Sequence, residues 1–375
     1  MTKAKLLFTG DFVYKQETHK QLFSDKFINL IKEQDIFSVN LEGPIINNTE
    51  NKVKKIGPVI SNNESVVNQI LQFDNIVFDL ANNHIYDYGK EGLKNTIEYL
   101  QRKNISFVGA GISHSQIYKP LIKDINGLKI GFINVAENGF GSSDINYNSG
   151  YAYIFSNEIE ECIKNLRNTV DYIILISHMG AEKWDIPLPE VRNVYKKFIN
   201  LGVDIIIGHH PHVPQGWEEY SGGLIFYSLG NFVFNINNTS SSYESYVVSI
   251  ELHENKKKTY SIIPIRFENN MIELIDKDYN YLKEYIDNQE EYMKMVEKNV
   301  IDAYNKIYKK CYYKVTVSYR ESLKERAKSF IKRNFLRNKF DDMILYHNLN
   351  IETHLWICQR ATKMLYKEKL KEWEQ

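Results

Sequence analysis

The stretch Asp204-Ile205-Ile206-Ile207-Gly208-His209-His210-Pro211-His212 leads a short apolar run directly into three histidines. Similar β-branched runs recur through the first two thirds of the chain, and helical patterns separate several of them. The runs that predict buried strands are 5–8, 36–41, 76–80, 105–108, 130–135, 172–177 and 204–207. The helical patterns cover 63–73, 89–102, 158–168 and 189–201. Strands that alternate with helices are typical of an α/β fold.

Other stretches predict antiparallel strands, so we expect mixed sheets. Asn126-Gly127 lies between two apolar runs, and this dipeptide is a strong signal for a two-residue hairpin. The alternating segments 223–234, 246–253 and 260–267 are expected to add further antiparallel strands.

The pattern changes after residue 269. Apolar residues then recur at helical spacing over 282–307 and again over 323–335, and a third helical pattern runs from about residue 349 to the C-terminus. We therefore expect two parts, an α/β domain over 1–269 and a helical extension over 270–375.

The charge of the chain is balanced as a whole but uneven along its length. Lysine and arginine total 47, as do aspartate and glutamate, which argues against a generally basic nucleic-acid-binding protein. Segment 306–339 nevertheless holds twelve basic residues and two acidic ones, a net charge of +10. A basic amphipathic helix can bind anionic lipid, nucleic acid or a partner protein. The alternative is a solvated helix face whose apolar side packs on the main domain.

Neither a membrane span nor a signal-peptide core is expected. The apolar runs are far shorter than the ~18 residues that cross a bilayer, and Thr9, Gly10 and Asp11 interrupt the apolar N-terminal stretch. The scattered cysteines Cys162, Cys311 and Cys358 have no metal-binding spacing and indicate reduced thiols. We expect a cytoplasmic protein, with peripheral attachment to the inner face of the membrane through 306–339 as an alternative.

Polar side chains follow the ends of five predicted strands. They are Asp11, Glu42, Asn82 to His84, His178, and His209 to His212. Since the carboxyl ends of strands in open α/β sheets border one crevice, we expect these side chains to converge. His-x-His at a strand end would present both imidazoles on one side. Carboxylate, amide and imidazole donors together suit Mn, Fe or Zn, so the sequence predicts a site for divalent metal ions.

Seven blocks in order resemble the CapA (poly-γ-glutamate capsule biosynthesis) family of the calcineurin-like metallophosphoesterase superfamily. The resemblance covers about residues 3–235. The blocks are Leu7-Phe8-Thr9-Gly10-Asp11, Asn40-Leu41-Glu42-Gly43-Pro44, Leu80-Ala81-Asn82-Asn83-His84 with Asp87 and Gly89, Val108-Gly109-Ala110-Gly111, His178-Met179-Gly180-Ala181-Glu182, Gly208-His209-His210-Pro211-His212-Val213 and Tyr227-Ser228-Leu229-Gly230-Asn231-Phe232.

The resemblance implies a four-layer α/β/β/α sandwich with two divalent metal ions. It implies that Asp11 binds the first ion, that Glu42 bridges both, and that Asn83 and His178 bind the second. His210 and His212 resemble the superfamily's His-x-His pair, one for each ion, and His84 resembles the histidine that acts on the phosphoryl group or the leaving group. Side chains expected to support these ligands are Asn82, Asp87, Glu182, His209 and Asn231.

Two positions depart from the superfamily pattern. Its first motif is usually Asp-x-His, whereas this chain has Asp11-Phe12-Val13, and its second motif usually supplies an aspartate where Glu42 stands here. CapA-like proteins share both departures. The first ion therefore has fewer protein ligands, which weakens the inference of phosphatase catalysis.

Three functions follow from the resemblance. The leading hypothesis is a dinuclear metal-dependent hydrolase of a phosphoester or related bond in capsule or surface-polymer biosynthesis, acting on an anionic polymer or a phosphorylated precursor. The second is a non-catalytic accessory subunit of a polymer synthase or export complex. The third is an amide hydrolase of poly-γ-glutamate.

Overall fold

The computed structural model describes residues 3–18, 20–46, 52–141, 148–236, 242–309 and 339–374. They form two compact units, one of residues 1–53 with 59–289 and one of 54–58 with 290–375. The boundary expected after residue 269 stays a prediction. Strand β16 (Met271–Leu274) and helix α7 (Asn280–Asp287), which follow that residue, belong to the first unit.

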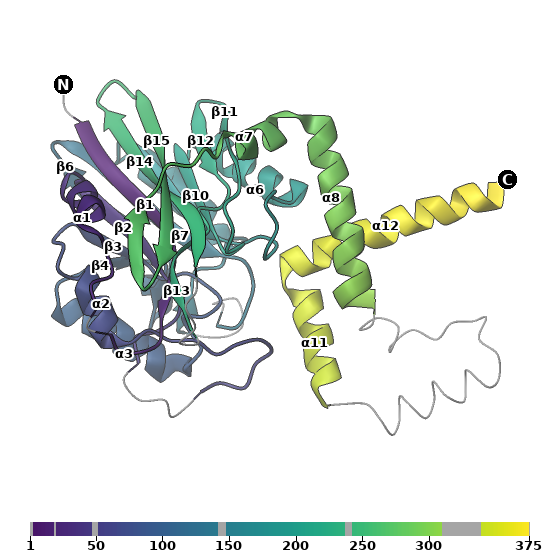
Figure 1. Ribbon diagram of the computed structural model, residues 1–375, viewed down its shortest axis with the longest axis horizontal. Coiled ribbons are helices and arrows are strands. Elements are labelled where there is room, and N and C mark those ends of the chain that lie inside the picture. Colours follow the sequence, from purple (N-terminus) through teal and green to yellow (C-terminus); the bar gives the residue numbers. More distant parts are fainter. Residues whose placement is uncertain are drawn as a thin grey trace. The chain divides into compact units, whose positions relative to one another are not determined.

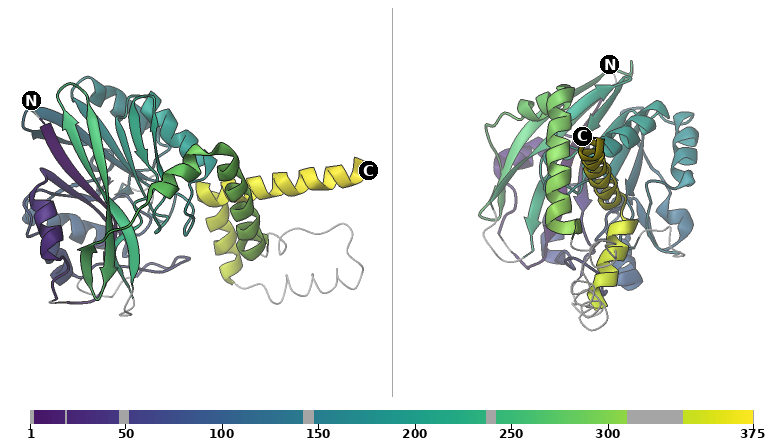
Figure 2. Two further views of the ribbon diagram at one scale, coloured as in Figure 1. Left: turned by 45° about the horizontal axis from the view of Figure 1, so that its top comes forward. Right: turned by 90° about the vertical axis from the view of Figure 1, so that its right-hand side faces the viewer.

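The first unit contains one eight-stranded sheet with mixed strand directions. Its main order is β16-β15-β14-β1-β2-β3-β4, and β13 pairs with β1 outside this path. The green strands β14 and β15 lie beside the purple β1 in Figures 1 and 2. The bounds are β1 (Lys3–Tyr14), β2 (Ile36–Leu41), β3 (Ile76–Asp79), β4 (Ser106–Val108), β13 (Asn231–Asn235), β14 (Tyr243–His253) and β15 (Lys258–Glu268).

A six-stranded sheet has the order β11-β12-β10-β9-β7-β6. Its strands are β6 (Leu121–Ile125), β7 (Leu128–Ala136), β9 (Tyr172–His178), β10 (Ile205–His209), β11 (Trp217–Tyr220) and β12 (Gly223–Phe226). The expected hairpin joins β6 to β7, with Gly127 at a φ of 85°. A two-stranded sheet pairs β5 (Ala110–Gly111) with β8 (Gly150–Tyr151).

Helices cover the outer faces of both large sheets. The helices of this unit are α1 (Asp25–Lys32), α2 (Glu64–Ile70), α3 (Gly89–Arg102), α4 (His114–Ile117), α5 (Asn157–Arg167), α6 (Pro189–Asn200) and α7. Leu93, Ile97 and Leu100 recur at helical spacing along α3 and are fully buried in the same core as Phe37 and Phe78 of the first sheet. Side chains of α5 and α6 pack on the second sheet in the same way, since Gly131 lies against Leu166 and Gly223 against Ile199.

A second core lies between the two large sheets. Leu6 and Ile250 of the first sheet share it with Ile130, Ile174 and Ile207 of the second, and each of these side chains is fully excluded from solvent. Helix, sheet, sheet and helix therefore form four layers, and the expected α/β/β/α sandwich is confirmed. The strands predicted at 5–8, 36–41, 76–80, 105–108, 130–135, 172–177 and 204–207 are all present.

The expectation of antiparallel strands over 223–234 was partly wrong. The segment divides into β12, which is parallel to β10, and β13, which crosses to the other sheet and is parallel to β1. Residues 227–230 connect the two strands. Alternating apolar residues cannot reveal this division because they look the same in either sheet.

The second unit contains helices, as expected for the end of the chain. They are α8 (Gln289–Ala303), a π-helical turn (Tyr304–Tyr308), α11 (Lys339–Asn350) and α12 (Glu352–Glu374). The single helix expected over 282–307 is divided at Asn288, whose ψ of 90° is extended. The pattern at 323–335 and most of the basic segment lie outside the described residues. None of the helices in the described part of the chain is long and apolar enough to span a membrane.

Candidate metal centre

Asp11 lies at an irregularity in strand β1. Up to Phe8 the strand pairs with β14, but from Asp11 onward it pairs with β13, and its pairing with β2 shifts between Phe8 and Asp11. We expected Asp11 to follow the end of a strand, whereas the strand continues to Tyr14. Such irregularities redirect side chains and are common beside functional sites.

Gly10 permits the close approach that this arrangement needs. A Cβ atom at Gly10 would lie 1.8 Å from the carbonyl oxygen of Gly230, and the backbone N–H of Asp11 donates a hydrogen bond to that same oxygen at 3.0 Å. The glycine before the carboxylate is therefore a steric requirement.

Glu42 follows β2 directly and is fully buried. The Asn82 side chain connects its loop to the loop after β3: Nδ2 donates to the carbonyl oxygen of Leu41 at 2.9 Å, and Oδ1 accepts from the backbone N–H groups of Gly43 and His84 at 3.3 and 3.2 Å. Asn82 thus fixes the Glu42 loop against the loop that carries Asn83 and His84.

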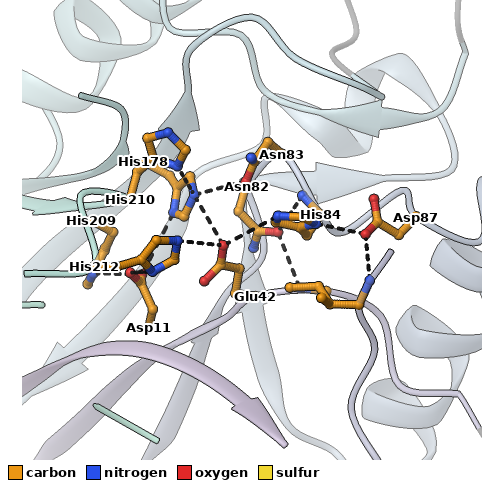
Figure 3. Close-up of polar contacts among 12 residues, drawn as sticks. Asp11, Glu42, Asn82, Asn83, His84, Asp87, His178, His209, His210 and His212 are labelled. Carbon is orange, nitrogen blue, oxygen red and sulfur yellow. Dashed lines mark hydrogen bonds and ion pairs between the residues drawn. The ribbon is translucent and has the colours of Figure 1, made fainter. Parts of the chain in front are cut away.

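Three predicted ligands meet around the Nε2 atom of His178, the last residue of β9. Oδ1 of Asn83 lies 3.1 Å from this atom and Nδ1 of His210 lies 3.0 Å from it. Oε1 of Glu42 lies 3.7 Å away. Asn83, His178 and the bridging Glu42, which were expected around the second metal ion, are therefore neighbours, and His210 is the histidine of the His-x-His pair that lies with them (Figure 3).

The first predicted ion would lie among Asp11, Glu42 and His212. Nδ1 of His212 is 3.1 Å from Oδ2 of Asp11, and its Nε2 is 3.7 Å from Oε1 of Glu42. Oδ1 of Asn231 contacts the same Nδ1 at 3.0 Å, which suits its predicted supporting role. Outer hydrogen bonds of this kind orient metal-binding histidines.

The backbone angles of His210 and His212, not the alternation of side chains along a strand, place the two imidazoles near each other. β10 ends at His209, and His210 and His212 lie beyond it with φ angles of 95° and 59°. The expectation that two-residue alternation along a strand would place both imidazoles together was wrong. Two left-handed residues on either side of Pro211 do so instead, and their ring centroids are 6.0 Å apart.

Glu42 provides the clearest indication of a bound ion. Within the described residues neither of its carboxylate oxygens has a hydrogen-bond partner, although the side chain is fully buried. Nitrogen atoms of His178, His212 and His84 lie 3.7, 3.7 and 3.9 Å from Oε1. A buried carboxylate that accepts no hydrogen bond is costly. A cation among these donors would neutralise it, so the residues fit a metal ion.

Burial and neighbouring charges move the pKa values of the two carboxylic acids in opposite directions. Burial raises the pKa of Glu42 to about 8, although His212 opposes this. Burial alone would raise the pKa of Asp11. The pKa is nevertheless below its usual value, because His212 contributes a hydrogen bond and a positive charge and the charges of His178 and His209 act in the same direction. Asp11 therefore favours the ionised form that binds metal.

The pKa values of the four histidines also shift in opposite directions, three downward and one upward. Burial lowers the pKa of His178 well below its usual value and lowers the pKa of His209 and His210 to about 4. These three rings are neutral at pH 7, as metal binding requires. For His212, the carboxylates of Glu42 and Asp11 outweigh burial and raise the pKa to about 9. A metal ion would have to displace that proton.

His84 lies on the other side of Glu42 from His212 (Figure 3). Its Nδ1 is 2.7 Å from Oδ2 of Asp87, which also accepts a hydrogen bond from the backbone N–H of Ile60 at 2.8 Å. Its Nε2 is 3.9 Å from Oε1 of Glu42. A carboxylate acceptor at Nδ1 holds the proton there and leaves Nε2 directed toward the site.

His209 and Glu182, two of the expected supporting residues, differ in their exposure to solvent. His209 is buried beside Asp11, with its Nδ1 3.6 Å from Oδ1 of that carboxylate. Glu182 lies on the solvent side, where a donor atom of each of Glu182, His210 and His212 falls within 4.8 Å of the others. Asp11, Glu42 and His212 form a second group of the same kind.

Glu137 belongs to the site but was not predicted. It follows β7 and is almost fully buried, its Oε1 accepts a hydrogen bond from the backbone N–H of Gly180 at 2.9 Å, and Nε2 of His210 is 3.9 Å away. The sequence could have indicated Glu137, because this residue lies just after a predicted strand, as Glu42 does. Asn40 was also missed as a site residue, and its Nδ2 donates to Oδ1 of Asp11 at 2.7 Å.

Residues 5–236 match the profile of the family described as bacterial capsule synthesis protein PGA_cap. The chain is 29% identical over 250 residues to the capsule biosynthesis protein CapA of Bacillus anthracis, covering 64% of this chain and 59% of that protein. It is 30% identical over 270 residues to the PGA biosynthesis protein CapA of Bacillus subtilis (strain 168), covering 69% of this chain and 70% of the relative. The chain thus spans less than two thirds of the Bacillus anthracis relative.

Similarity to solved structures is more distant. A 5'-nucleotidase from Candida albicans SC5314 is 13% identical, with a TM-score of 0.42, over 78% of this chain and 56% of the nucleotidase. A hypothetical protein from Thermus thermophilus is 12% identical, with a TM-score of 0.43, over 70% of this chain and 99% of that protein. Similarities at this level do not assign an activity.

Proposed function

Because the chain belongs to the PGA_cap family of bacterial capsule synthesis proteins, we propose that it is a metal-dependent hydrolase in the synthesis of a surface polymer. The bond that it cleaves is a phosphoester or a related bond in an anionic polymer or its phosphorylated precursor. The observation that carries the proposal is the buried Glu42 carboxylate, which lies among imidazole nitrogens and has no hydrogen-bond partner among the described residues.

Two ions fit the donors around Glu42. Asp11, Glu42 and His212 would hold one ion, and Glu42, Asn83, His178 and His210 would hold the other. The mixture of oxygen and nitrogen donors suits Mn, Fe or Zn. Such a pair of ions lowers the pKa of a bound water and neutralises charge that develops on the substrate's oxygens.

His84 and Asp87 supply the proton chemistry that the metal ligands do not. Asp87 accepts the Nδ1 proton of His84, so Nε2 is the atom that can donate to a phosphoryl oxygen or to a leaving group. Both side chains are largely excluded from water, which keeps the pair in one orientation. His84 is thus the acid–base group of the proposed reaction.

Metal content and hydrolysis, measured together, test this function. We expect the purified protein to bind up to two Mn, Fe or Zn ions and to cleave a phosphodiester or a phosphomonoester. A γ-glutamyl amide in the same panel tests amide hydrolysis. His178→Ala should lose metal and activity while remaining folded, and His114→Ala, at an exposed position paired with Glu158, should keep both. A folded wild-type protein that binds no metal and cleaves no substrate in the presence of manganese would exclude the proposal.

A non-catalytic role in polymer assembly is the second candidate. The names of the Bacillus relatives give a role in biosynthesis without naming a reaction, and the basic segment 306–339 could bind an anionic polymer, a membrane surface or a synthase. If an inactive His84→Gln variant restores polymer formation in cells that lack the wild-type protein, the accessory role is favoured. If only active variants restore it, hydrolysis is required.

A further inference from the structure

The loop after β9 is fixed against the histidine-rich loop after β10. The backbone N–H of Met179 donates to the carbonyl oxygen of His209 at 3.2 Å, and that of Lys183 donates to the carbonyl oxygen of Pro211 at 2.8 Å. Glu182 lies directly before the second of these contacts. The backbone therefore holds Glu182 beside the His-x-His segment.

Close packing strengthens this attachment. A Cβ atom at Gly180 would lie 3.2 Å from Cγ of Pro211, so the two loops are in contact on both sides of Glu182. Lys183 also has a positive φ, 65°, which turns the chain immediately after Glu182. The position of the Glu182 backbone is thus set by contacts on both neighbouring segments.

The histidines that face Glu182 have strained backbones. A φ of 95° at His210 is uncommon for a residue with a side chain, and His212 has a φ of 59°. Backbone strain of this kind is uncommon and is concentrated at functional sites. Here the strained conformation brings both imidazoles toward the loop that carries Glu182.

Glu182, His210 and His212 offer three donor atoms that all lie within 4.8 Å of one another. Glu182 is exposed to solvent and the two imidazoles are partly buried, so this group faces outward. The buried group of Asp11 and Glu42 shares His212 with it. The outward and buried positions are therefore adjacent.

We propose that Glu182 is a third carboxylate ligand of the metal centre and lies on its solvent-facing side, where it binds an ion that His210 or His212 also binds. Imidazole and carboxylate groups are common ligands of zinc and related ions. The inference goes beyond the ligands expected from the family resemblance. It rests on the proposed function only in requiring that the site bind metal.

Metal titration of the full chain tests this assignment directly. Glu182→Gln and Glu182→Ala should weaken the binding of at least one Zn²⁺ or Mn²⁺ ion by about tenfold or more, measured by calorimetry, a size typical for a ligand or its close support. The visible absorption of the Co²⁺-loaded protein should also change, because it reports on the ligands themselves. Unchanged thermal unfolding of the metal-free variants would show that the fold is intact.

Asp185→Asn is the matched control, because it removes an exposed carboxylate from the same loop. It should leave both metal affinity and the Co²⁺ spectrum as in the wild type. If Asp185→Asn weakens binding as much as Glu182→Gln does, general charge is responsible and the assignment falls. It also falls if Glu182→Ala binds metal within about twofold of the wild type.

The outcomes separate this inference from the proposed function. Normal metal binding and normal hydrolysis in Glu182→Ala would remove Glu182 from the ligand set and leave the hydrolase proposal in place. Metal binding that depends on Glu182 in a wild-type protein that cleaves no member of the substrate panel would support the ligand and contradict the hydrolase.

Discussion

Nδ1 of His84 lies 2.7 Å from Oδ2 of Asp87, and both side chains are almost completely buried. The contact fixes which ring nitrogen faces Glu42. It also separates two tasks in the site, because His84 and Asp87 need not bind metal in order to act on the substrate.

Replacing His84 should therefore reduce turnover without removing metal. We expect His84→Gln to lower kcat on the order of 10²–10⁴-fold, the usual contribution of a general acid or base. Asp87→Asn should have a smaller effect in the same direction. The loss should be greatest for phosphoesters with poor leaving groups and small for p-nitrophenyl esters, which need little protonation. Equal losses across leaving groups would contradict the acid role.

The Asn231 contact with His212 predicts a specific effect on metal affinity. Asn231→Ala removes the oxygen that lies 3.0 Å from Nδ1 of His212, and the loss of such a partner weakens metal binding about 10–100-fold. Asn235→Ala is the control, because Asn235 lies on the same strand and its side chain donates to Asn270. Calorimetric titration of both variants should separate them, and equal affinities would contradict the supporting role.

Gly10 should not tolerate a side chain. In Gly10→Ala the new methyl group would overlap the Gly230 carbonyl oxygen at 1.8 Å, so we expect a loss of more than about 3 kcal/mol in the free energy of unfolding. Gly222→Ala should cost only about 1–2 kcal/mol, since Gly222 has a φ of 80° but open space around it. Urea unfolding of the two metal-free variants measures the difference, and similar losses would show that the close approach is not limiting.

Asp79 predicts a dependence of stability on pH that is separate from the metal site. The side chain is 1% exposed and accepts a hydrogen bond from Oγ of Ser38 at 2.6 Å, and burial raises its pKa to about 8. The group is therefore protonated in the folded protein but ionised in the unfolded chain between about pH 4 and pH 8. The stabilising contribution of the Asp79 side chain to the free energy of unfolding is therefore complete below about pH 4 and is lost as the pH rises toward 8.

Asp79→Asn removes this titration and keeps the shape of the side chain. The free energy of unfolding of the wild type should fall relative to the variant between pH 5 and pH 8, and each unit of pKa difference contributes about 1.4 kcal/mol at most. The difference should become constant above pH 9. Parallel stability curves for the two proteins across this range would contradict a raised pKa at Asp79.

Much of the fold follows from local patterns that the sequence displays directly. Apolar β-branched runs predicted β1 to β4 of one large sheet and β7, β9 and β10 of the other, and Asn126-Gly127 predicted the turn between β6 and β7. Local patterns were less informative at 223–234, where β12 and β13 belong to different sheets. Alternation identifies the buried face of a strand but does not specify which sheet it joins.

The chemical groups available to the site follow from the amino-acid sequence alone. Asp11, Glu42 and the histidines of 209–212 could be identified as metal-binding types from their places near strand ends. Their orientation toward one another depends on the tertiary fold. A shift in the pairing of β1 redirects Asp11, left-handed backbone angles turn His210 and His212, and hydrogen bonds between two loops hold Glu182 beside them. Each depends on contacts between residues far apart in the chain, which local sequence patterns do not encode.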